Sequence, residues 1–253
     1  VIIVIAAVSS LVVLVPALFG TGASTEVPTG TKVKGGAVSR GSSPLAALGL
    51  GAGLLLALVG IKNVHRVPDG LVGYGRYLPT YSTLPSFLYV GEGINSTVAV
   101  SELSNGDRNF HVAGKIEAST EPQDMRLQRM LGHLTTLLSP SPKSVINIGC
   151  GAGVTAGAVS ISPLVQKLTI AEIEPLVPKV VSELFGEHNY NVVRNPKTHV
   201  QIDDARHFLL TTHEKFDAIT SDPFDPWVKG AATLYTREFF QEVKRHLKPG
   251  GVV

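Results

Sequence analysis

The sequence predicts an α/β fold with a parallel, doubly wound sheet, preceded by a small antiparallel β unit and two membrane-spanning helices. Three observations carry this prediction: an uncharged N-terminal part, three short strands around a turn, and strand–helix alternation from residue 144 onward. Such alternation is typical of a parallel sheet with helices on both faces. The expected organisation is 1–61 for the two membrane helices and a Gly/Ser/Thr-rich linker, 62–80 for a juxtamembrane linker, 81–120 for the β unit and 121–253 for the α/β domain.

Composition limits the function classes. The chain has 253 residues, with 22 Lys and Arg against 20 Asp and Glu, so its formal net charge is +2. This near-neutral balance argues against binding nucleic acid by bulk electrostatics. The one cysteine, Cys150, excludes an intramolecular disulfide and a multi-cysteine metal site. The mean hydropathy of +0.23 is high for an ordinary globular domain, so we expect two unlike parts.

Two uncharged runs, residues 1–19 and 44–61, account for the high hydropathy. Each is close to the roughly 20 residues that a helix needs to cross a membrane. A secretory signal peptide or buried helices are the alternatives, but the missing initial Met and the second run favour membrane spans. We therefore expect a multi-pass membrane protein whose N-terminal helices contact lipid. Because the chain lacks Met and stops at Val253 as a fifth strand begins, we also expect a fragment cut at both ends.

The small β unit is predicted from residues 87–91, 97–101 and 109–113, which are short, apolar and rich in β-formers. Asn105-Gly106 lies between the second and third of these segments and is a strong hairpin-turn signal. A unit of this size is too small to be stable alone, so it must pack on the following domain.

The α/β domain begins with an amphipathic helix over residues 124–138. The predicted strands of its parallel sheet are residues 144–149, 167–172, 199–203, 216–222 and a fifth that begins at 252. A helix over residues 238–247 ends before Pro249-Gly250. In a sheet of this kind the ligand binds at the carboxyl ends of the strands.

The first two strand ends predict a nucleoside-type ligand. Gly149, Gly151 and Gly153 follow the first strand and precede a helix, where glycine lets the backbone approach a ligand closely. A tight strand–helix turn without a ligand is the alternative. Glu172 ends the second strand and can accept both ribose hydroxyl protons, with Glu174 as the alternative carboxylate.

The third strand ends at Asp203, Asp204 and Ala205. A carboxylate at this place can accept a hydrogen bond from an adenine amino group. An acidic pair after a strand is also a common helix cap, so both interpretations stay open.

The fourth strand end combines Asp222 and Asp225 with two prolines and Trp227. A proline restricts the preceding residue to extended conformations, which helps to aim these carboxylates. Such a pair can hold and deprotonate a cationic amine. The alternative is a proline-rich turn with capping acids.

These features together resemble a known family. Residues 144–253 look like the nucleotide-binding domain of the polyamine aminopropyltransferases, the spermidine synthase family, through the segments 216–222 and 233–240. The predicted hairpin and the helix before Pro140 are similar to the family's small N-terminal β unit. The uncharged N-terminal runs resemble a bacterial subgroup in which membrane helices precede such a domain. The resemblance implies a Rossmann-like sheet of the class I S-adenosylmethionine-dependent transferases.

The resemblance also implies an activity. The family transfers the aminopropyl group of decarboxylated S-adenosylmethionine to an amine such as putrescine, releases methylthioadenosine and needs no metal. The resemblance assigns catalysis to Asp222. The implied cofactor-binding residues are Gly149, Gly151, Gly153, Glu172, Asp203, Asp204 and Ala205. The implied substrate-binding residues are Gln128, Asp225, Trp227 and Tyr235.

The amine half of the site departs from the family pattern more than the nucleoside half does. Ala152 stands where the family usually has an Asp that contacts the amine end of the donor. The family's Asp-Gly…Gln segment is replaced by Ala-Gly-Lys-Ile-Glu at residues 113–117. Its Tyr-Gln pair is replaced by Leu127-Gln128, and its Gly-Pro-Gly by Val-Lys-Gly at residues 228–230. Ordinary S-adenosylmethionine with a methyl acceptor therefore stays an alternative, as does a non-catalytic nucleoside-binding domain that regulates a membrane bundle.

The resemblance sets the expected partners. They are a polyamine substrate and membrane lipid, with no nucleic acid and with a homo-oligomer as an open possibility. Because the donor is made in the cytosol, we expect the catalytic domain to face the cytoplasm.

Overall fold

The structure is a computed structural model that describes residues 44–63, 66–222, 225–226 and 230–253. The chain divides into two compact units, residues 1–66 and 67–253, and each is described by itself.

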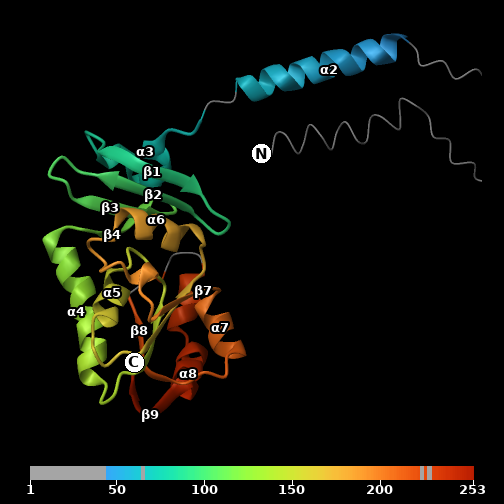
Figure 1. Cartoon of the computed structure of the whole chain (residues 1–253). Helices are drawn as coiled ribbons and strands as arrows, with labels where there is room; N and C mark the ends of the chain where they lie inside the picture. Colours follow the sequence, from blue (N-terminus) through green and yellow to red (C-terminus); the bar gives the residue numbers. More distant parts are fainter. Residues whose placement is uncertain (1–43, 64–65, 223–224, 227–229) are drawn as a thin grey trace, which may run out of the picture. The chain divides into compact units, whose positions relative to one another are not determined.

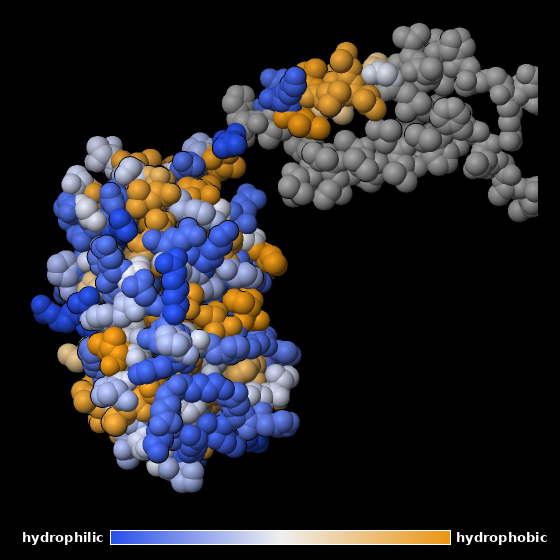
Figure 2. Space-filling view, in the orientation of Figure 1, coloured by the Kyte–Doolittle hydropathy of each residue, from blue (hydrophilic) through white to orange (hydrophobic). Residues whose placement is uncertain are grey.

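The first unit contains helix α2 (Pro44–Lys62). Its apolar side chains are exposed from Leu54 onward, with Leu56 reaching 72% exposure. Figure 2 shows this helix as a largely hydrophobic surface.

The expectation of membrane-spanning helices is not upheld. Across residues 44–63, 66–222, 225–226 and 230–253, no helix combines the length and apolar composition needed to cross a membrane. The first predicted span, residues 1–19, lies outside the described residues, and the second coincides with α2. The 19 residues of α2 end in a lysine, and at about 1.5 Å each they cover about 28 Å, less than the roughly 30 Å of hydrocarbon. This finding corrects the prediction of a multi-pass membrane location with lipid contact and a cytoplasm-facing catalytic domain.

The second unit begins with two short helices and an antiparallel sheet. These elements are α3 (Asp69–Tyr74), η1 (Gly75–Thr80), β1 (Ser86–Glu92), β2 (Thr97–Glu102), β3 (Arg108–Val112) and β4 (Lys115–Ser119), with strand order β1-β2-β3-β4. The predicted turn holds, because Gly106 adopts a φ of +87° between β2 and β3. Strand β4 was not predicted from the sequence. The buried ring of His111 accepts or donates at both nitrogens, to Ser101 Oγ at 2.8 Å and the Gly73 carbonyl at 2.8 Å, and so fixes α3 to the sheet.

The larger sheet is parallel throughout, as predicted. Its strands are β5 (Ser144–Ile148), β6 (Lys167–Glu172), β7 (Thr198–Ile202), β8 (Phe216–Ser221) and β9 (Leu247–Val252). Their spatial order is β7-β6-β5-β8-β9, so the direction of progress along the sheet reverses between β5 and β8. Strand β9 begins five residues earlier than predicted, because the Lys-Pro-Gly-Gly segment before Val252 belongs to the strand rather than to a loop.

Helices cover both faces of this sheet (Figure 1). They are α4 (Pro122–Leu138), α5 (Val154–Ser160), α6 (Leu176–Leu184), α7 (Ala205–Thr211) and α8 (Arg237–His246), with short turns η2 (Val192–Arg194) and η3 (Ala231–Tyr235). Neighbouring strand residues point to opposite faces. Val145 therefore packs in the core that contains α5 residues, whereas Ile146 packs in the core beneath α7 and α8.

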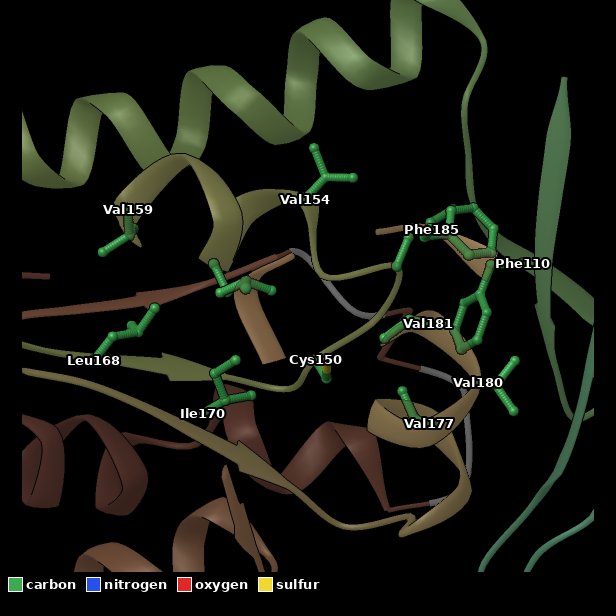
Figure 3. Packing of buried hydrophobic residues seen from close by; sticks show 14 of the residues in the cluster. Phe110, Cys150, Val154, Val159, Leu168, Ile170, Val177, Val180, Val181 and Phe185 are labelled. Atoms are coloured by element: carbon green, nitrogen blue, oxygen red, sulfur yellow. The ribbon is translucent and has the colours of Figure 1, made fainter. Parts of the chain in front are cut away.

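The small sheet shares a core with the parallel sheet. Phe110 of β3 meets Phe185, which follows α6, edge to face at a ring-centroid distance of 6.1 Å (Figure 3). The same cluster includes Leu168 and Ile170 of β6 (Figure 3). The antiparallel unit is thus stabilised by packing on the α/β domain.

Candidate functional site

The site lies at the carboxyl ends of β5 and β8, where the strand order reverses. The glycine loop follows β5, and Asp222 follows β8 directly. Loops diverge at such a reversal and leave a crevice, which is where open α/β sheets bind their ligands. The topology therefore brings the predicted glycine loop and the predicted catalytic carboxylate to one place.

The glycine loop has the backbone that its sequence requires. Gly149, Gly151 and Gly153 have φ values of +77°, +51° and +79°, a region that other residues rarely adopt. A Cβ at Gly153 would lie 2.8 Å from the side-chain amide nitrogen of Asn189, so a larger residue would also clash there. At Gly151 a Cβ would meet nothing within 4 Å, so this part of the loop is open to an incoming group.

Glu172 ends β6 beside this loop. Its carboxylate accepts hydrogen bonds from the backbone N–H of Cys150 at 2.7 Å and of Glu174 at 2.9 Å. Burial raises the pKa of Glu172, and these backbone hydrogen bonds act in the opposite direction. A carboxylate has about four acceptor positions, of which these backbone N–H groups take at least two, and a contact from Glu172 to a ribose stays a prediction.

Glu174, the alternative ribose ligand, has a different task. Its buried carboxylate accepts from the backbone N–H groups of Asn95 at 2.7 Å, Ser96 at 3.3 Å and Leu176 at 3.1 Å. It therefore joins the β1–β2 turn to the start of α6. The Glu174 carboxylate also lies against Gly93, where an added Cβ would be only 2.3 Å from it.

The carboxylates after β7 make local contacts. Asp204 caps α7 by accepting from the N–H groups of Arg206 at 2.8 Å and His207 at 3.1 Å. Asp203 contacts the imidazole of His207 at 2.9 Å, and Ala205 is buried. The helix-cap interpretation thus holds for Asp204, and a contact to adenine stays a prediction.

Asp222 is held by a residue that the sequence interpretation missed. The hydroxyl oxygen of Thr155, in the first turn of α5, lies 2.9 and 3.0 Å from the two carboxylate oxygens of Asp222. It also lies 3.1 Å from the backbone carbonyl of Gln128 in α4, so these three residues converge. Burial raises the pKa of Asp222, the Thr155 hydrogen bond lowers it, and the negative charge of Asp124 raises it further. A hydroxyl two residues after the last glycine of the loop is the sequence signal that could have identified Thr155.

The residues that were predicted to bind the substrate lie in different surroundings. The side chain of Gln128 is buried and donates to the Ser119 carbonyl at 3.3 Å. Tyr235 and Asp222 line one cavity of about 400 Å³, together with apolar side chains such as Leu131. Trp227 lies outside the described residues.

Asp225 is paired within the chain. Its carboxylate contacts the ammonium of Lys115, at the start of β4, and this ammonium lies 3.6 Å from the Glu117 carboxylate. The contact joins the small sheet to the segment after β8. Elsewhere in the described part of the chain, no group of three or more His, Cys, Asp or Glu side chains is arranged to hold a metal ion.

A family model and the curated relatives point to the same family. Residues 124–253, slightly more than half of the chain, match the family described as spermine/spermidine synthase domain. Polyamine aminopropyltransferase 1 of Pseudomonas aeruginosa is 31% identical over 181 residues, which cover 72% of this chain and 61% of that protein. Spermidine synthase 1 of Hyoscyamus niger is 31% identical over 167 residues, covering 66% of this chain and 52% of that protein. The chain spans about half to three fifths of the length of such curated relatives.

Solved structures share the fold. The spermidine synthase of Thermotoga maritima superposes with a TM-score of 0.58 and 25% identity over 65% of this chain and 55% of that one. A spermidine synthase in complex with the transition-state analogue AdoDATO gives a TM-score of 0.59, and at 24% identity it supports the fold alone, over 64% of this chain and 55% of that one. From the matched domain and the relatives together, the chain belongs to the spermine/spermidine synthase family.

Proposed function

We propose that this chain is an aminopropyltransferase, which moves the aminopropyl group of decarboxylated S-adenosylmethionine to an amine. The observation that carries the proposal is the position of Asp222. Its carboxylate follows β8, lies at the reversal of strand order opposite the glycine loop, and is held by Thr155. A partly enclosed carboxylate beside a nucleoside-binding loop suits the capture of a cationic amine.

In the proposed step the amine nitrogen attacks the methylene carbon that is bonded to the donor's sulfonium sulfur. The new C–N bond forms as the C–S bond breaks, and the bonding electrons leave with sulfur as methylthioadenosine. The proton of the amine passes to Asp222. An alkylammonium has a pKa near that of Lys, about 10, so it becomes nucleophilic only when a base takes this proton. Burial, which raises the pKa of Asp222, makes this carboxylate a stronger base.

The nucleoside half of the donor is assigned to the glycine loop and the strand ends beside it. We propose that Gly149, Gly151 and Gly153 line the nucleoside, while Glu172 accepts from the ribose hydroxyls. Asp203, Asp204 and Ala205 then lie on the adenine side. The open space at Gly151 and the spare acceptor positions of Glu172 support this assignment.

The amine half is assigned to residues around Asp222. We propose that Gln128, Tyr235 and Asp225 contact the acceptor, with Trp227 as a further wall. Gln128 lies near Asp222, because its backbone carbonyl contacts the same Thr155 hydroxyl, and this proximity supports the first of these. The shared cavity supports Tyr235.

One observation favours a second candidate, a methyltransferase that uses ordinary S-adenosylmethionine. Ala152 of the glycine loop is 2% exposed and carries no charge. The carboxylate of ordinary S-adenosylmethionine therefore meets no like charge at this position. Under this alternative a methyl group, not an aminopropyl group, is transferred.

The test compares the two donors on the full chain. Binding of decarboxylated and ordinary S-adenosylmethionine is measured by isothermal titration, followed by product analysis with putrescine and a panel of other amines. We expect tighter binding of the decarboxylated donor and release of methylthioadenosine. The Asp222→Asn variant should lower transfer by about 10²- to 10⁴-fold while keeping donor binding.

Asp217→Asn is the matched control. Asp217 lies near the other end of the same strand, where it contacts Ser144 and Lys248. This variant should keep its activity. Transfer of a methyl group would establish the second candidate, and tight donor binding without turnover on any amine would exclude both transferases.

A further inference from the structure

A second cavity, of about 570 Å³, lies between α4 and the segment that follows α6. Its basic lining residues are Arg126, Arg129 and His133 of α4 and His188 of the following segment. Within the described part of the chain, no Asp or Glu side chain lines this cavity. It shares no lining residue with the cavity of Asp222, so its positive charge belongs to a separate place in the fold.

The two walls of this cavity are both held by α5. A Cβ at Gly132 of α4 would lie 2.4 Å from the Thr155 carbonyl oxygen of α5. A Cβ at Gly157 of α5 would lie 2.3 Å from the carbonyl oxygen of Asn189, next to His188. The basic residues of α4 are three and four positions apart, so they project from one side of that helix. The walls are thus in place before a ligand arrives, which lowers the cost of binding.

The arginines of the cavity lack an anionic partner. Neither Arg126 nor Arg129 takes part in the ion pairs of the described residues. The Arg129 guanidinium lies 5.6 Å from the centre of the Tyr190 ring, and its buried Nε–H meets no hydrogen-bond acceptor in the described part of the chain. Asp124, in the first turn of α4, accepts from Ser119 instead, at 2.6 and 2.9 Å.

A buried donor without an acceptor costs stability, and native proteins satisfy nearly all such groups. An oxyanion in the cavity would supply the missing acceptor. Guanidinium groups bind phosphate oxygens through paired N–H donors. A phosphate group carries about −1.5 to −2 near pH 7, so it matches two guanidinium charges better than a single carboxylate does. The volume of the cavity also leaves room for a small group attached to the phosphate.

We propose that this cavity is a binding site for a phosphate group, either the free ion or the end of a small phosphate ester. Arg126 and Arg129 neutralise its charge, and the ring N–H groups of His133 and His188 donate to its oxygens. The inference goes beyond the proposed function, because neither the donor, the amine nor methylthioadenosine carries a phosphate. The site therefore lies outside the transfer step.

The test titrates the full chain with inorganic phosphate, ribose 5-phosphate and acetate, at an ionic strength kept constant with sodium chloride. Binding is followed by isothermal titration and by the ¹⁵N–¹H resonance of the Arg129 Nε–H, which is assigned by its loss in Arg129→Gln. This resonance should move to saturation with both phosphates, which should bind at least about tenfold more tightly than acetate. Tighter binding of the ester identifies an ester as the ligand, and otherwise the ligand is the free ion.

The variants separate a built site from general attraction. Arg129→Gln should weaken phosphate binding by at least about tenfold, and Arg126→Gln by at least about threefold, because each loses charge-assisted hydrogen bonds. Arg245→Gln is the matched control, since it removes the same charge from α8, where Arg245 pairs with Glu242 at 2.5 Å. It should leave the affinity unchanged. If thermal unfolding shows that Arg129→Gln does not fold, Arg126→Gln carries the comparison, because that side chain is exposed.

The inference is overturned if phosphate moves the Arg129 resonance no further than chloride does at equal ionic strength. Equal weakening by Arg245→Gln and Arg129→Gln would also overturn it, since only attraction to the net charge would remain. Acetate binding as tightly as phosphate would exclude a phosphate site. Displacement of the phosphate by methylthioadenosine would place the ion at the nucleoside site instead. None of these readouts needs turnover, so they do not depend on the proposed function.

Discussion

Thr155 donates a hydrogen bond to Asp222 across an oxygen–oxygen distance of 2.9 Å, and so links the first turn of α5 to the end of β8. The two residues are 67 positions apart in the sequence. The glycine loop and the proposed base thus belong to one hydrogen-bonded unit. The orientation of Asp222 thus depends on a residue that lies two positions after Gly153, the last glycine of the loop.

The first prediction concerns this hydrogen bond. Thr155→Val keeps the side-chain shape but removes the donor, so Asp222 loses the group that fixes its orientation. We expect kcat to fall by about tenfold, which corresponds to roughly 1.4 kcal/mol, with donor affinity changed little. Steady-state kinetics and donor titration measure the two quantities. Thr155→Ser keeps the hydroxyl and should retain most activity, and equal losses in both variants would point to packing instead.

The second prediction concerns pH. Asp222 must be ionised to accept a proton, so transfer should fall as the pH drops through its pKa. Because burial raises that pKa, the acid limb should lie above the ordinary Asp value of about 3.9. The Thr155 hydrogen bond lowers the pKa, so Thr155→Val should move the acid limb to still higher pH. The profile of kcat against pH for both proteins is the measurement, and an unmoved limb would show that another group titrates.

The third prediction concerns stability at the same residue. A carboxyl whose pKa is raised in the folded protein favours folding below its unfolded pKa, and this contribution is lost as the pH rises through the folded value. Near neutral pH the ionised Asp222 therefore costs stability, and Asp222→Asn should recover about 0.5–1 kcal/mol although it slows transfer. Thermal unfolding at several pH values tests this. The difference between the proteins should shrink in acid, and a variant less stable than the wild type near pH 7 would refute it.

Much of the fold was predictable because its strands are short, apolar and bounded by glycine or proline. Strand β6 was predicted to the residue, and the parallel direction of the strands followed from strand–helix alternation. Strand β4 was missed because its turn starts at Ala113, a residue type rarely found at a φ of +52°, so that Gly114 alone marked the turn. Strand β9 was misplaced because Pro249-Gly250 reads as a helix stop, although these residues lie within the strand.

The site was predictable only where one local segment defines it. The glycine loop follows β5 directly and Glu172 ends β6, so position along the chain was enough to place both at the strand ends. The Thr155–Asp222 and Lys115–Asp225 contacts join residues 67 and 110 positions apart. Such contacts depend on which strands are neighbours, which the sequence alone does not specify.

The fourth prediction separates two neighbouring carboxylates. Glu174→Ala removes a buried acceptor of three backbone N–H groups, so it should destabilise the protein by about 2–3 kcal/mol and increase hydrogen exchange at Asn95 and Ser96. Glu172→Ala also removes the acceptor of two backbone N–H groups and should cost stability, but it alone should weaken donor binding, by at least about tenfold from the loss of charged hydrogen bonds. Denaturant unfolding and donor titration are run on both variants. The reverse pattern would make Glu174 the ribose ligand.

The fifth prediction concerns the close packing of α4 on α5. A Cβ at Gly132 would lie 2.4 Å from the Thr155 carbonyl oxygen and 2.7 Å from the Ala158 Cβ, both far inside contact distance. The first of these obstacles is backbone, so Gly132→Ala must move one helix away from the other. We expect a destabilisation of about 1–3 kcal/mol, measured by denaturant unfolding.

The same displacement should reach the site. The backbone that must move is that of Thr155 itself, so its hydroxyl shifts relative to the Asp222 carboxylate, to which it donates across 2.9 Å. Transfer should therefore fall in Gly132→Ala even under conditions where the variant is fully folded. Gly51→Ala is the control, because a Cβ there meets nothing within 4 Å and alanine favours a helix over glycine by about 1 kcal/mol. If Gly132→Ala were as stable and active as Gly51→Ala, α4 would not be the support of the Thr155–Asp222 pair.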